Sequence, residues 1–382
     1  MEKQTTSFGI SNNINNPNVS YKAMSKGENK IMGIVGKRET TVWNLFAIFL
    51  APTVAVTAGA YANAQMPYLL QSEDHYGIEF SNVGNQTGTI LFWSYLASCI
   101  VTPFLGYAYD VVGRFRLIVT SLAIMIVCVA IMPHASPYFF ALVVFRSILS
   151  TAIQAIQVNP LIVDYVKNES RGLMVSFAGS AVVFGELLMI ILFSATRSME
   201  MNGQYLAPAI IIAGFASIIV FLIREPKIKQ PPMENNNPEN GPVLEMSFWG
   251  KLAFLSRDTW NECKDRPKYP FTFICLVGTR LISILFSVYM QLWIMSFVES
   301  GVLESKSDSE AIYMKVMAIS MVTLAIVGPV FGYMSNRIDS RVLIPISFLS
   351  RAICAISFRF IEDPSEWPAM VLCVLISVVS TV

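Results

Sequence analysis

Ten apolar stretches, each close to the length of a helix that crosses a lipid bilayer, constrain this chain more than any other feature. A hydrocarbon core of about 30 Å needs about 20 helical residues, and only helices or closed barrels satisfy every backbone hydrogen bond inside it. The stretches are Val42–Tyr61, Gly88–Tyr109, Leu117–Met132, Tyr138–Val158, Leu173–Ser194, Tyr205–Ile223, Phe271–Val298, Ile312–Phe331, Val342–Phe360 and Pro368–Val382. They predict an all-α membrane protein with about ten transmembrane helices.

The composition agrees with a chain embedded in a membrane. Hydrophobic residues make up 54% of the 382 residues and charged residues only 14%, whereas soluble domains carry about a quarter charged residues. The net charge of +1 gives no indication of a nucleic-acid partner. The six cysteines show no CxxC spacing and there are only two histidines, so we expect neither a metal site nor another cofactor.

Basic residues predict the orientation in the membrane, because cytoplasmic loops carry an excess of Lys and Arg. Residues 71–87 contain three acids and no Lys or Arg, and residues 133–137 carry no Lys, Arg, Asp or Glu. The alternate loops are basic, with Arg114, Arg116, Lys167, Arg171, Arg224, Lys227, Lys229, Arg337 and Arg341. We therefore expect a multi-pass protein with a cytoplasmic N-terminus.

The apolar stretches divide the chain into four parts. Residues 1–40 are polar and predict a disordered cytoplasmic tail, and residues 41–223 predict a bundle of six helices. Residues 224–269 predict a cytoplasmic linker in which Leu244–Trp260 has the spacing of an amphipathic helix. That helix could lie on the membrane surface or against the protein's own inner face. Residues 270–382 predict a second bundle with four helices.

A short motif occurs in both bundles. Val101–Tyr107 reads VTPFLGY and Val327–Tyr333 reads VGPVFGY, and Asp110 in the first copy corresponds to Asn336 in the second. Each copy ends the second predicted helix of its bundle and precedes a short basic loop. The matching positions predict an internal duplication, which is an architecture of membrane transporters.

The first copy continues into a turn that resembles the signature loop of the major facilitator superfamily. The pattern of that loop is Gly, three residues, Asp, two residues, Gly and a basic pair. Here it reads Gly106, Asp110, Gly113 and Arg114, with Phe115 separating Arg114 from the second arginine. We expect Gly106 to let two helices approach closely and Gly113 to allow a tight turn.

The resemblance extends beyond this loop and implies a conformational gate. Arg146 lies where the family has its helix-four arginine, although the glycine-rich continuation is absent. Asp164, with Arg171 and Gly172 after it, resembles the element that joins the family's fourth and fifth helices. In the family such charges latch the outward-facing state, which assigns a gate to Asp110, Arg114, Asp164 and Arg171.

The resemblance also implies two six-helix bundles, of which the second is incomplete here. The repeat requires two further helices after Val382, so we expect the sequence to be a fragment or a truncated reading frame. Without those helices the second bundle would lack part of its cavity wall.

Four ionisable residues fall at membrane depth, where charged groups are costly and therefore candidates for function. They are Arg146, Glu186, Arg280 and Arg351. The resemblance implies that Arg146 and Arg280 line the central cavity, where two guanidinium groups would suit a carboxylate or phosphate. The alternatives are an ion pair between Arg146 and Glu186 and a packing role for Arg280. Arg351 is expected to face away from the cavity.

Glu186 is also a candidate for proton coupling, since burial raises the pKa of a carboxyl group and a nearby arginine lowers it. Uncharged polar residues within the helices could bind hydroxyl or amide groups, or hold the helices together. They are Asn63, Gln65, Gln154, Gln157, Asn159 and Gln291.

The leading functional hypothesis is a secondary active transporter that moves a small organic solute by alternating access, with organic anions slightly favoured. One alternative is a proton-coupled drug or metabolite exporter, although residues 179–186 lack the Gly-Pro pair typical of those exporters. Another is a membrane receptor or scaffold of the same fold that does not transport. The chain has no GxxxxGK[ST] motif and no set of residues that predicts an enzyme. The expected partners are the lipid bilayer, a small solute and, as a coupled ion, the proton.

Overall fold

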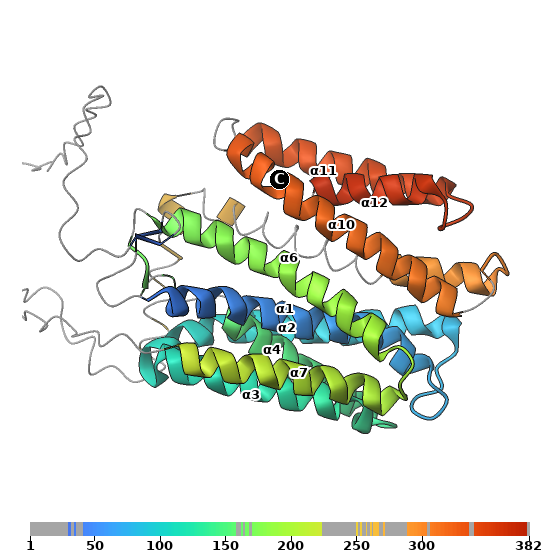
Figure 1. Ribbon diagram of the computed structural model, residues 1–382, viewed down its shortest axis with the longest axis horizontal. Coiled ribbons are helices and arrows are strands. Elements are labelled where there is room, and N and C mark those ends of the chain that lie inside the picture. Colours follow the sequence, from blue (N-terminus) through green and yellow to red (C-terminus); the bar gives the residue numbers. More distant parts are fainter. Residues whose placement is uncertain are drawn as a thin grey trace, which may run out of the picture.

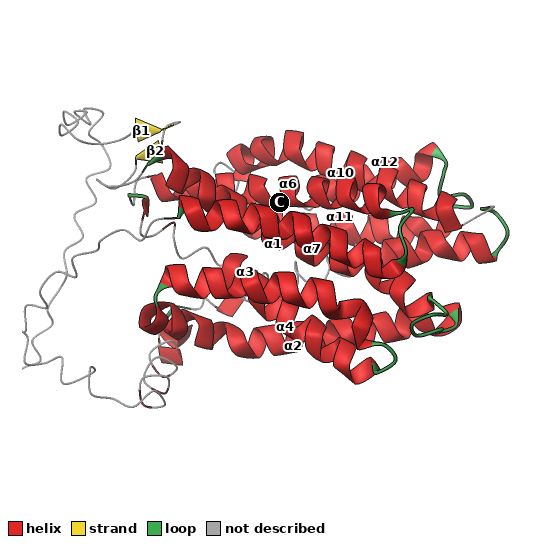
Figure 2. Ribbon diagram, turned by 60° about the horizontal axis from the view of Figure 1, so that its bottom comes forward, coloured by secondary structure: helices red, strands yellow, loops and turns green. Residues whose placement is uncertain are grey.

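The structure is a computed structural model of the 382-residue chain. It describes residues 30–31, 34–35, 41–157, 162, 165–167, 170–223, 250, 253, 257, 260–261, 263–266, 270–271, 289–303, 306–335 and 340–379. Long helices dominate these residues and run roughly parallel to one another (Figures 1 and 2).

The first bundle is built around α1, which contacts each of its other labelled α-helices. The bundle consists of α1 (Val42–Gln71), α2 (Phe80–Val112), α3 (Arg114–Ile131), the short helix η1 (Met132–Ala135), α4 (Phe139–Gln157), α6 (Arg171–Thr196) and α7 (Met201–Leu222). Most of α1 is buried. An apolar helix surrounded by other helices is the expected centre of such a bundle.

The described part of the second bundle is smaller. It comprises helical residues 289–299, α10 (Lys306–Ser335), α11 (Ser340–Ser357), η4 (Phe358–Phe360) and α12 (Trp367–Val379). α12 packs against both α10 and α11 (Figure 1).

These helices confirm the prediction of an all-α membrane protein. In the part of the chain that the structure describes, α1, α3, α4, α6, α7 and α10 contain segments long and apolar enough to cross a bilayer. α2, α11 and α12 also coincide with predicted stretches, and residues 289–299 occupy the end of the seventh.

The predicted linker lies mostly outside the described residues. Among its described members, residues 253, 257 and 260–261 are helical. In the predicted tail, β1 (Lys30–Ile31) pairs antiparallel with β2 (Ile34–Val35), where the prediction was a segment without regular structure. The β-branched Ile31, Ile34 and Val35 favour extended backbone.

α1 is longer than its apolar stretch, which ended at Tyr61. The helix continues to Gln71 through Asn63, Gln65 and Pro67. Polar side chains can extend a membrane helix when they bond to neighbouring helices, and Gln65 is only 2% exposed. The predicted stretch stopped at Tyr61 because polar residues follow it. In the structure most of the residues that follow are buried inside the bundle, and the helix continues through them.

α1 and α6 approach each other closely at Gly185. A Cβ atom on this glycine would lie 2.5 Å from the backbone oxygen of Thr53 and 2.9 Å from Cβ of Val56. The hydroxyl of Thr57 donates a hydrogen bond of 2.9 Å to the carbonyl oxygen of Gly185. A small residue thus lets the two helices meet and a hydroxyl fixes their register.

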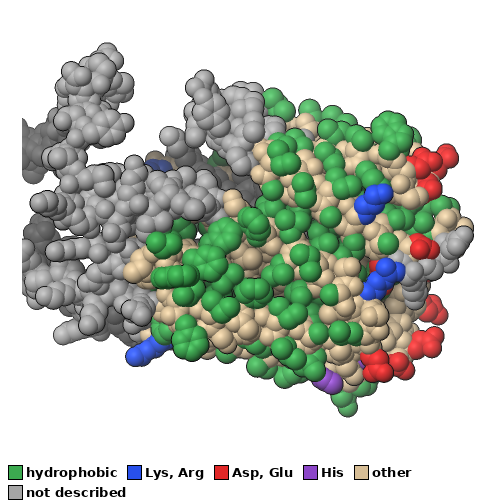
Figure 3. All heavy atoms as spheres, viewed as in Figure 1, with side chains coloured by type: hydrophobic (Ala, Val, Ile, Leu, Met, Phe, Trp, Pro, Cys, Tyr) green, Lys and Arg blue, Asp and Glu red, His purple; other side chains and the backbone are tan. Residues whose placement is uncertain are grey.

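The surface between the two ends of the bundles is apolar. Phe92, Trp93, Phe140 and Phe221 are among the large hydrophobic side chains that it exposes, and hydrophobic side chains cover much of the face shown in Figure 3. Acidic side chains gather at one edge of that face (Figure 3). An apolar surface of this extent suits contact with lipid.

We name the end at which α1 begins the predicted cytoplasmic face and the end at which α1 finishes the predicted outer face. The two bundles meet near the predicted outer face through one cluster of buried side chains. Its members from the first bundle are Tyr61, Ala64, Tyr68, Met189, Leu192 and Phe193, and those from the second are Met290, Ile294, Met295, Leu303, Tyr313, Val316, Met317 and Cys373.

Candidate functional site

Arg146 lies in α4 at the centre of the first bundle and is 1% exposed. Its Nη2 donates a hydrogen bond of 2.5 Å to Oδ1 of Asn63 on α1. Its Nε and Nη1 have no hydrogen-bond partner among the residues that the structure describes. A buried guanidinium with two unused donors carries a desolvation penalty, so a bound anion or ordered water suits this position.

Tyrosines surround this guanidinium on two further helices. Tyr95 of α2 lies close enough to Arg146 for a side-chain hydrogen-bond interaction, and Tyr205 of α7 lies within electrostatic range of it. The hydroxyl of Tyr205 is buried and has no hydrogen-bond partner. Asn63, Tyr95, Arg146 and Tyr205 therefore form a polar centre contributed by four helices, and it holds both donors and acceptors.

Glu186 lies on α6 in a different environment. It is half-buried, directly follows Gly185 at the contact with α1, and is electrostatically close to Tyr313 of α10. The ion pair between Glu186 and Arg146, one of the alternatives that the sequence allowed, is not formed. The guanidinium of Arg146 bonds to Asn63 instead. The reason is the arrangement of helices, because α1 packs against both α4 and α6 and lies between them.

Several predicted site residues lie outside the described residues. Arg280, Asn159 and Asp164 are among them, and for Asp110 and Arg171 only the backbone is described, within α2 and at the start of α6. Arg351 is buried in α11 with its guanidinium carbon 5.7 Å from the centre of the Phe348 ring, a local contact of the cation–π type.

The signature loop forms a sharp turn. α2 ends at Val112 and α3 begins at Arg114, so Gly113 alone connects them, with a φ of 94°. Residues with a side chain rarely adopt this conformation, which confirms the expected role of Gly113.

The described residues do not show the close helix contact expected at Gly106. No described atom lies within 4 Å of the position that its Cβ would occupy, and the residue is exposed. Gly106 therefore does not mediate a close helix contact in this conformation, whereas Gly185 does.

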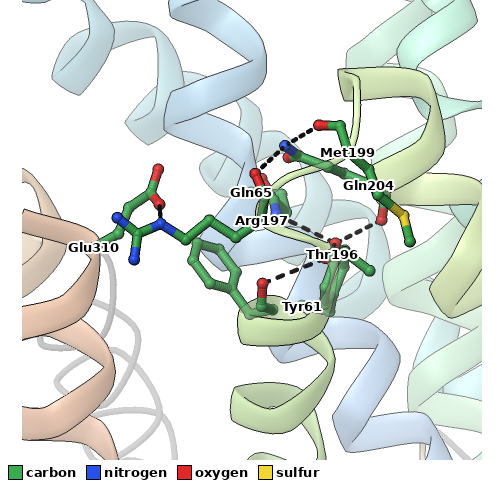
Figure 4. A network of polar contacts seen from close by, with 8 residues as sticks. Tyr61, Gln65, Thr196, Arg197, Met199, Gln204 and Glu310 are labelled. Carbon is green, nitrogen blue, oxygen red and sulfur yellow. Dashed lines mark hydrogen bonds and ion pairs between the residues drawn. The ribbon is translucent and has the colours of Figure 1, made fainter. Parts of the chain in front are cut away.

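A polar network that the sequence did not predict lies near the predicted outer face (Figure 4). The Tyr61 hydroxyl contacts Oγ1 of Thr196 at 2.8 Å and donates to the backbone oxygen of Gln204 at 2.5 Å. Nε2 of Gln65 donates to the same hydroxyl at 3.2 Å. The network joins α1, α6 and α7 next to the contact between the bundles.

Polar contacts between described residues cross from one bundle to the other. Nε of Arg197, at the end of α6, lies 2.7 Å from Oε2 of Glu310 on α10 (Figure 4). Nε2 of Gln291 donates a hydrogen bond of 2.7 Å to the backbone oxygen of Ala64. These contacts and the apolar cluster hold the bundles together at the predicted outer face.

A pocket of about 180 Å³ lies beside the ion pair. Its wall comes from both bundles and consists of Gln65, Tyr68, Gln71, Ser72, Phe193, Arg197, Met201, Gln204 and Glu310. In the described part of the chain, no group of three His, Cys, Asp or Glu side chains is placed to bind a metal ion.

Solved structures with a similar fold are membrane transporters. A nucleoside transporter, NupG, has a TM-score of 0.60 and 16% identity, over 89% of this chain and 79% of its own. A D-xylose–proton symporter has a TM-score of 0.56 and 15% identity, over 88% and 80%. An inward-facing, unoccupied bacterial homologue of the human lysosomal transporter Spinster has a TM-score of 0.57 and 13% identity, over 90% and 74%.

At these identities the solved structures establish the fold alone. No curated protein sequence matches the chain. The profile of the major facilitator superfamily matches residues 39–382, which is most of the chain. The duplicated motif, the glycine turn and the two bundles all agree with that match. The chain therefore belongs to the major facilitator superfamily, whose members are membrane transporters.

Proposed function

We propose that this protein is a secondary active transporter of a small organic anion, and that Arg146 binds the carboxylate or phosphate group of the solute. One observation carries the anion preference. The guanidinium of Arg146 is 1% exposed and two of its nitrogens have no partner. An anionic oxygen on those nitrogens would satisfy donors that the protein leaves unused.

Asn63 supports this role because its hydrogen bond orients the arginine, and Tyr205 adds a buried hydroxyl to the surroundings. Asn63 accepts from one end of the guanidinium and leaves the other nitrogens available. Arg280 of the second bundle is the proposed second arginine of the cavity. A contact from each guanidinium would bind an anion from two sides.

Alternating access is the proposed transport mechanism, with the N-terminus in the cytoplasm. The bundles meet near the predicted outer face through the apolar cluster and the Arg197–Glu310 ion pair. This arrangement supports a state closed at that face. The proposed latch of the opposite state consists of Gly106, Asp110, Gly113, Arg114, Asp164 and Arg171.

Glu186 is the proposed proton carrier. Its carboxyl lies on α6 near Tyr313 of α10, so rearrangement of the bundles would change its surroundings. Exposure to water on one side of the cycle and burial on the other would shift its proton affinity. We expect a pH gradient to drive uptake in the parent. In Glu186→Gln, uptake should not respond to that gradient.

Thermal unfolding of the full chain in lipid nanodiscs tests the anion site. Succinate, lactate and glycerol 3-phosphate are compared with succinamide, lactamide and glycerol. We expect at least one anion to raise the Tm by several degrees and its uncharged counterpart to have no effect. The shift should disappear in Arg146→Met and persist in Arg359→Met, which removes an exposed arginine.

Equal stabilisation of the parent and Arg146→Met would refute the anion site. Binding without uptake in proteoliposomes would favour the receptor alternative over the transporter. Export of a cationic drug in place of anion uptake would favour the exporter.

A further inference from the structure

The pocket beside the Arg197–Glu310 ion pair is distinct from the polar centre at Arg146. It lies at the predicted outer end of the contact between the bundles, where Glu310 of α10 faces residues of α1, α6 and α7. Its volume of about 180 Å³ corresponds to roughly six water molecules at about 30 Å³ each. A small solute fits a space of this size.

The wall of the pocket contains polar groups that have no hydrogen-bond partner in the described part of the chain. Gln65 is 2% exposed, and its Oε1 has no hydrogen-bond partner although its Nε2 bonds to Tyr61. Nε2 of Gln71 is buried and also has no partner. One group accepts and the other donates, so a ligand with both a donor and an acceptor would satisfy the two amides.

The two charged residues of the wall narrow the class of ligand further. Arg197 and Glu310 are 37% and 18% exposed and contact each other at 2.7 Å. A solute with a single charge would be attracted by one of them and repelled by the other. A zwitterion can place its carboxylate near the guanidinium and its ammonium near the carboxylate, so that both charges remain paired.

We propose that this pocket binds a small zwitterion, a solute with one carboxylate and one ammonium group. The carboxylate binds Arg197 and the amide of Gln71, and the ammonium binds Glu310 and Oε1 of Gln65. Because the ligand replaces each partner of the ion pair with a group of the same charge, it lets the bundles separate without leaving either charge unpaired. The site does not depend on the anion site at Arg146.

The test measures the access of a reagent to the pocket. Ser72→Cys, at a position that lines the pocket but is assigned no contact with the ligand, is introduced into the full chain in nanodiscs. Its reaction with a maleimide is followed, with the labelling of the parent's own cysteines subtracted. The zwitterionic probe is norvaline. Three controls each lack part of it: valerate has no ammonium group, butylammonium has no carboxylate, and xylitol has no charge. We expect norvaline to slow the reaction at least threefold and the other three to have little effect.

Two further substitutions test the assignment of groups. In Gln65→Leu the protection by norvaline should weaken at least threefold, while Gln86→Leu, a glutamine of α2 outside the pocket, should leave it unchanged. In Glu310→Gln the preference should change, so that valerate protects as well as norvaline. A cooperative thermal unfolding transition serves as the check that each variant is folded, and protection is expressed relative to the same variant's rate without ligand.

Three results would overturn the proposal. They are equal protection by xylitol and norvaline, protection by none of the probes, and a preference for norvaline over valerate that Glu310→Gln leaves unchanged. Each can be distinguished from a failure of the anion site, because that site is tested by Arg146→Met and by thermal shifts with different ligands.

Discussion

Arg197 and Glu310 form an ion pair of 2.7 Å that connects the end of α6 in the first bundle with α10 in the second. Both side chains are partly exposed, and such pairs contribute up to about 1 kcal/mol. An interaction of that size changes a conformational equilibrium by up to about fivefold. The pair can thus bias the predicted outer face toward closure without locking it.

Arg197→Met should therefore shift the protein toward a state open at the predicted outer face, by a factor of about two to five. Pulsed electron spin resonance between labels at Asp74 and Glu362, one on each bundle, measures this population. The double exchange of Arg197 to Glu and Glu310 to Arg should restore the parent distribution, and Glu200→Gln should not change it. Identical distance distributions in the parent and Arg197→Met would exclude a closing role.

Gly185→Ala should destabilise the protein by about 1–3 kcal/mol, because its Cβ would overlap the backbone of α1 at Thr53. Gly179→Ala is the matched control on α6, since no described atom lies within 4 Å of its Cβ position. Thermal unfolding in nanodiscs should show a lower Tm for Gly185→Ala alone. Equal Tm values for both variants would contradict the close contact of α1 and α6.

Ionisation of Tyr76, in the loop between α1 and α2, should lower the stability of the folded protein at high pH. Burial raises the pKa of its hydroxyl from 10.0 to about 12. The folded state thus favours the neutral form, so this contribution is complete below pH 10 and is lost as the pH rises to 12. In Tyr76→Phe the fall in Tm between pH 10 and 12 should be smaller. Tyr138→Phe, an exposed tyrosine, should behave as the parent does.

Arg146 and Asn63 should affect stability in opposite directions. Arg146→Met removes two buried, unpaired nitrogens, so the Tm should be unchanged or higher. Asn63→Leu removes the acceptor of Nη2 and should cost about 1–3 kcal/mol. A large destabilisation by Arg146→Met would instead mean that the arginine has a structural role.

The positions of the helices along the chain could be predicted because long apolar stretches mark them. The end of α1 could not, since Asn63, Gln65 and Pro67 resemble the end of a helix. Only the bond of Asn63 to Arg146 and the burial of Gln65 show that the helix continues inside the bundle. The sequence predicted a close approach at Gly106, but the contact occurs at Gly185. A glycine's role depends on the neighbouring helix, which the local sequence does not specify.

The candidate site was predicted only in part for the same reason. Arg146 was identified because a charge at membrane depth is unusual, but its partner is Asn63 and not Glu186. Arg197 and Glu310 were missed because each resembles an ordinary charge near a helix end. Only the contact between the bundles brings them together.

Uptake of a labelled anion tests the central proposal most directly. Proteoliposomes that contain the full chain are preloaded with the anion that gives the largest thermal shift, and the entry of the labelled form is followed by counterflow. We predict saturable uptake above empty liposomes in the parent, and at least a tenfold loss in Arg146→Met with Arg359→Met unaffected. The absence of saturable uptake in the parent, or undiminished uptake in Arg146→Met, would contradict the proposal.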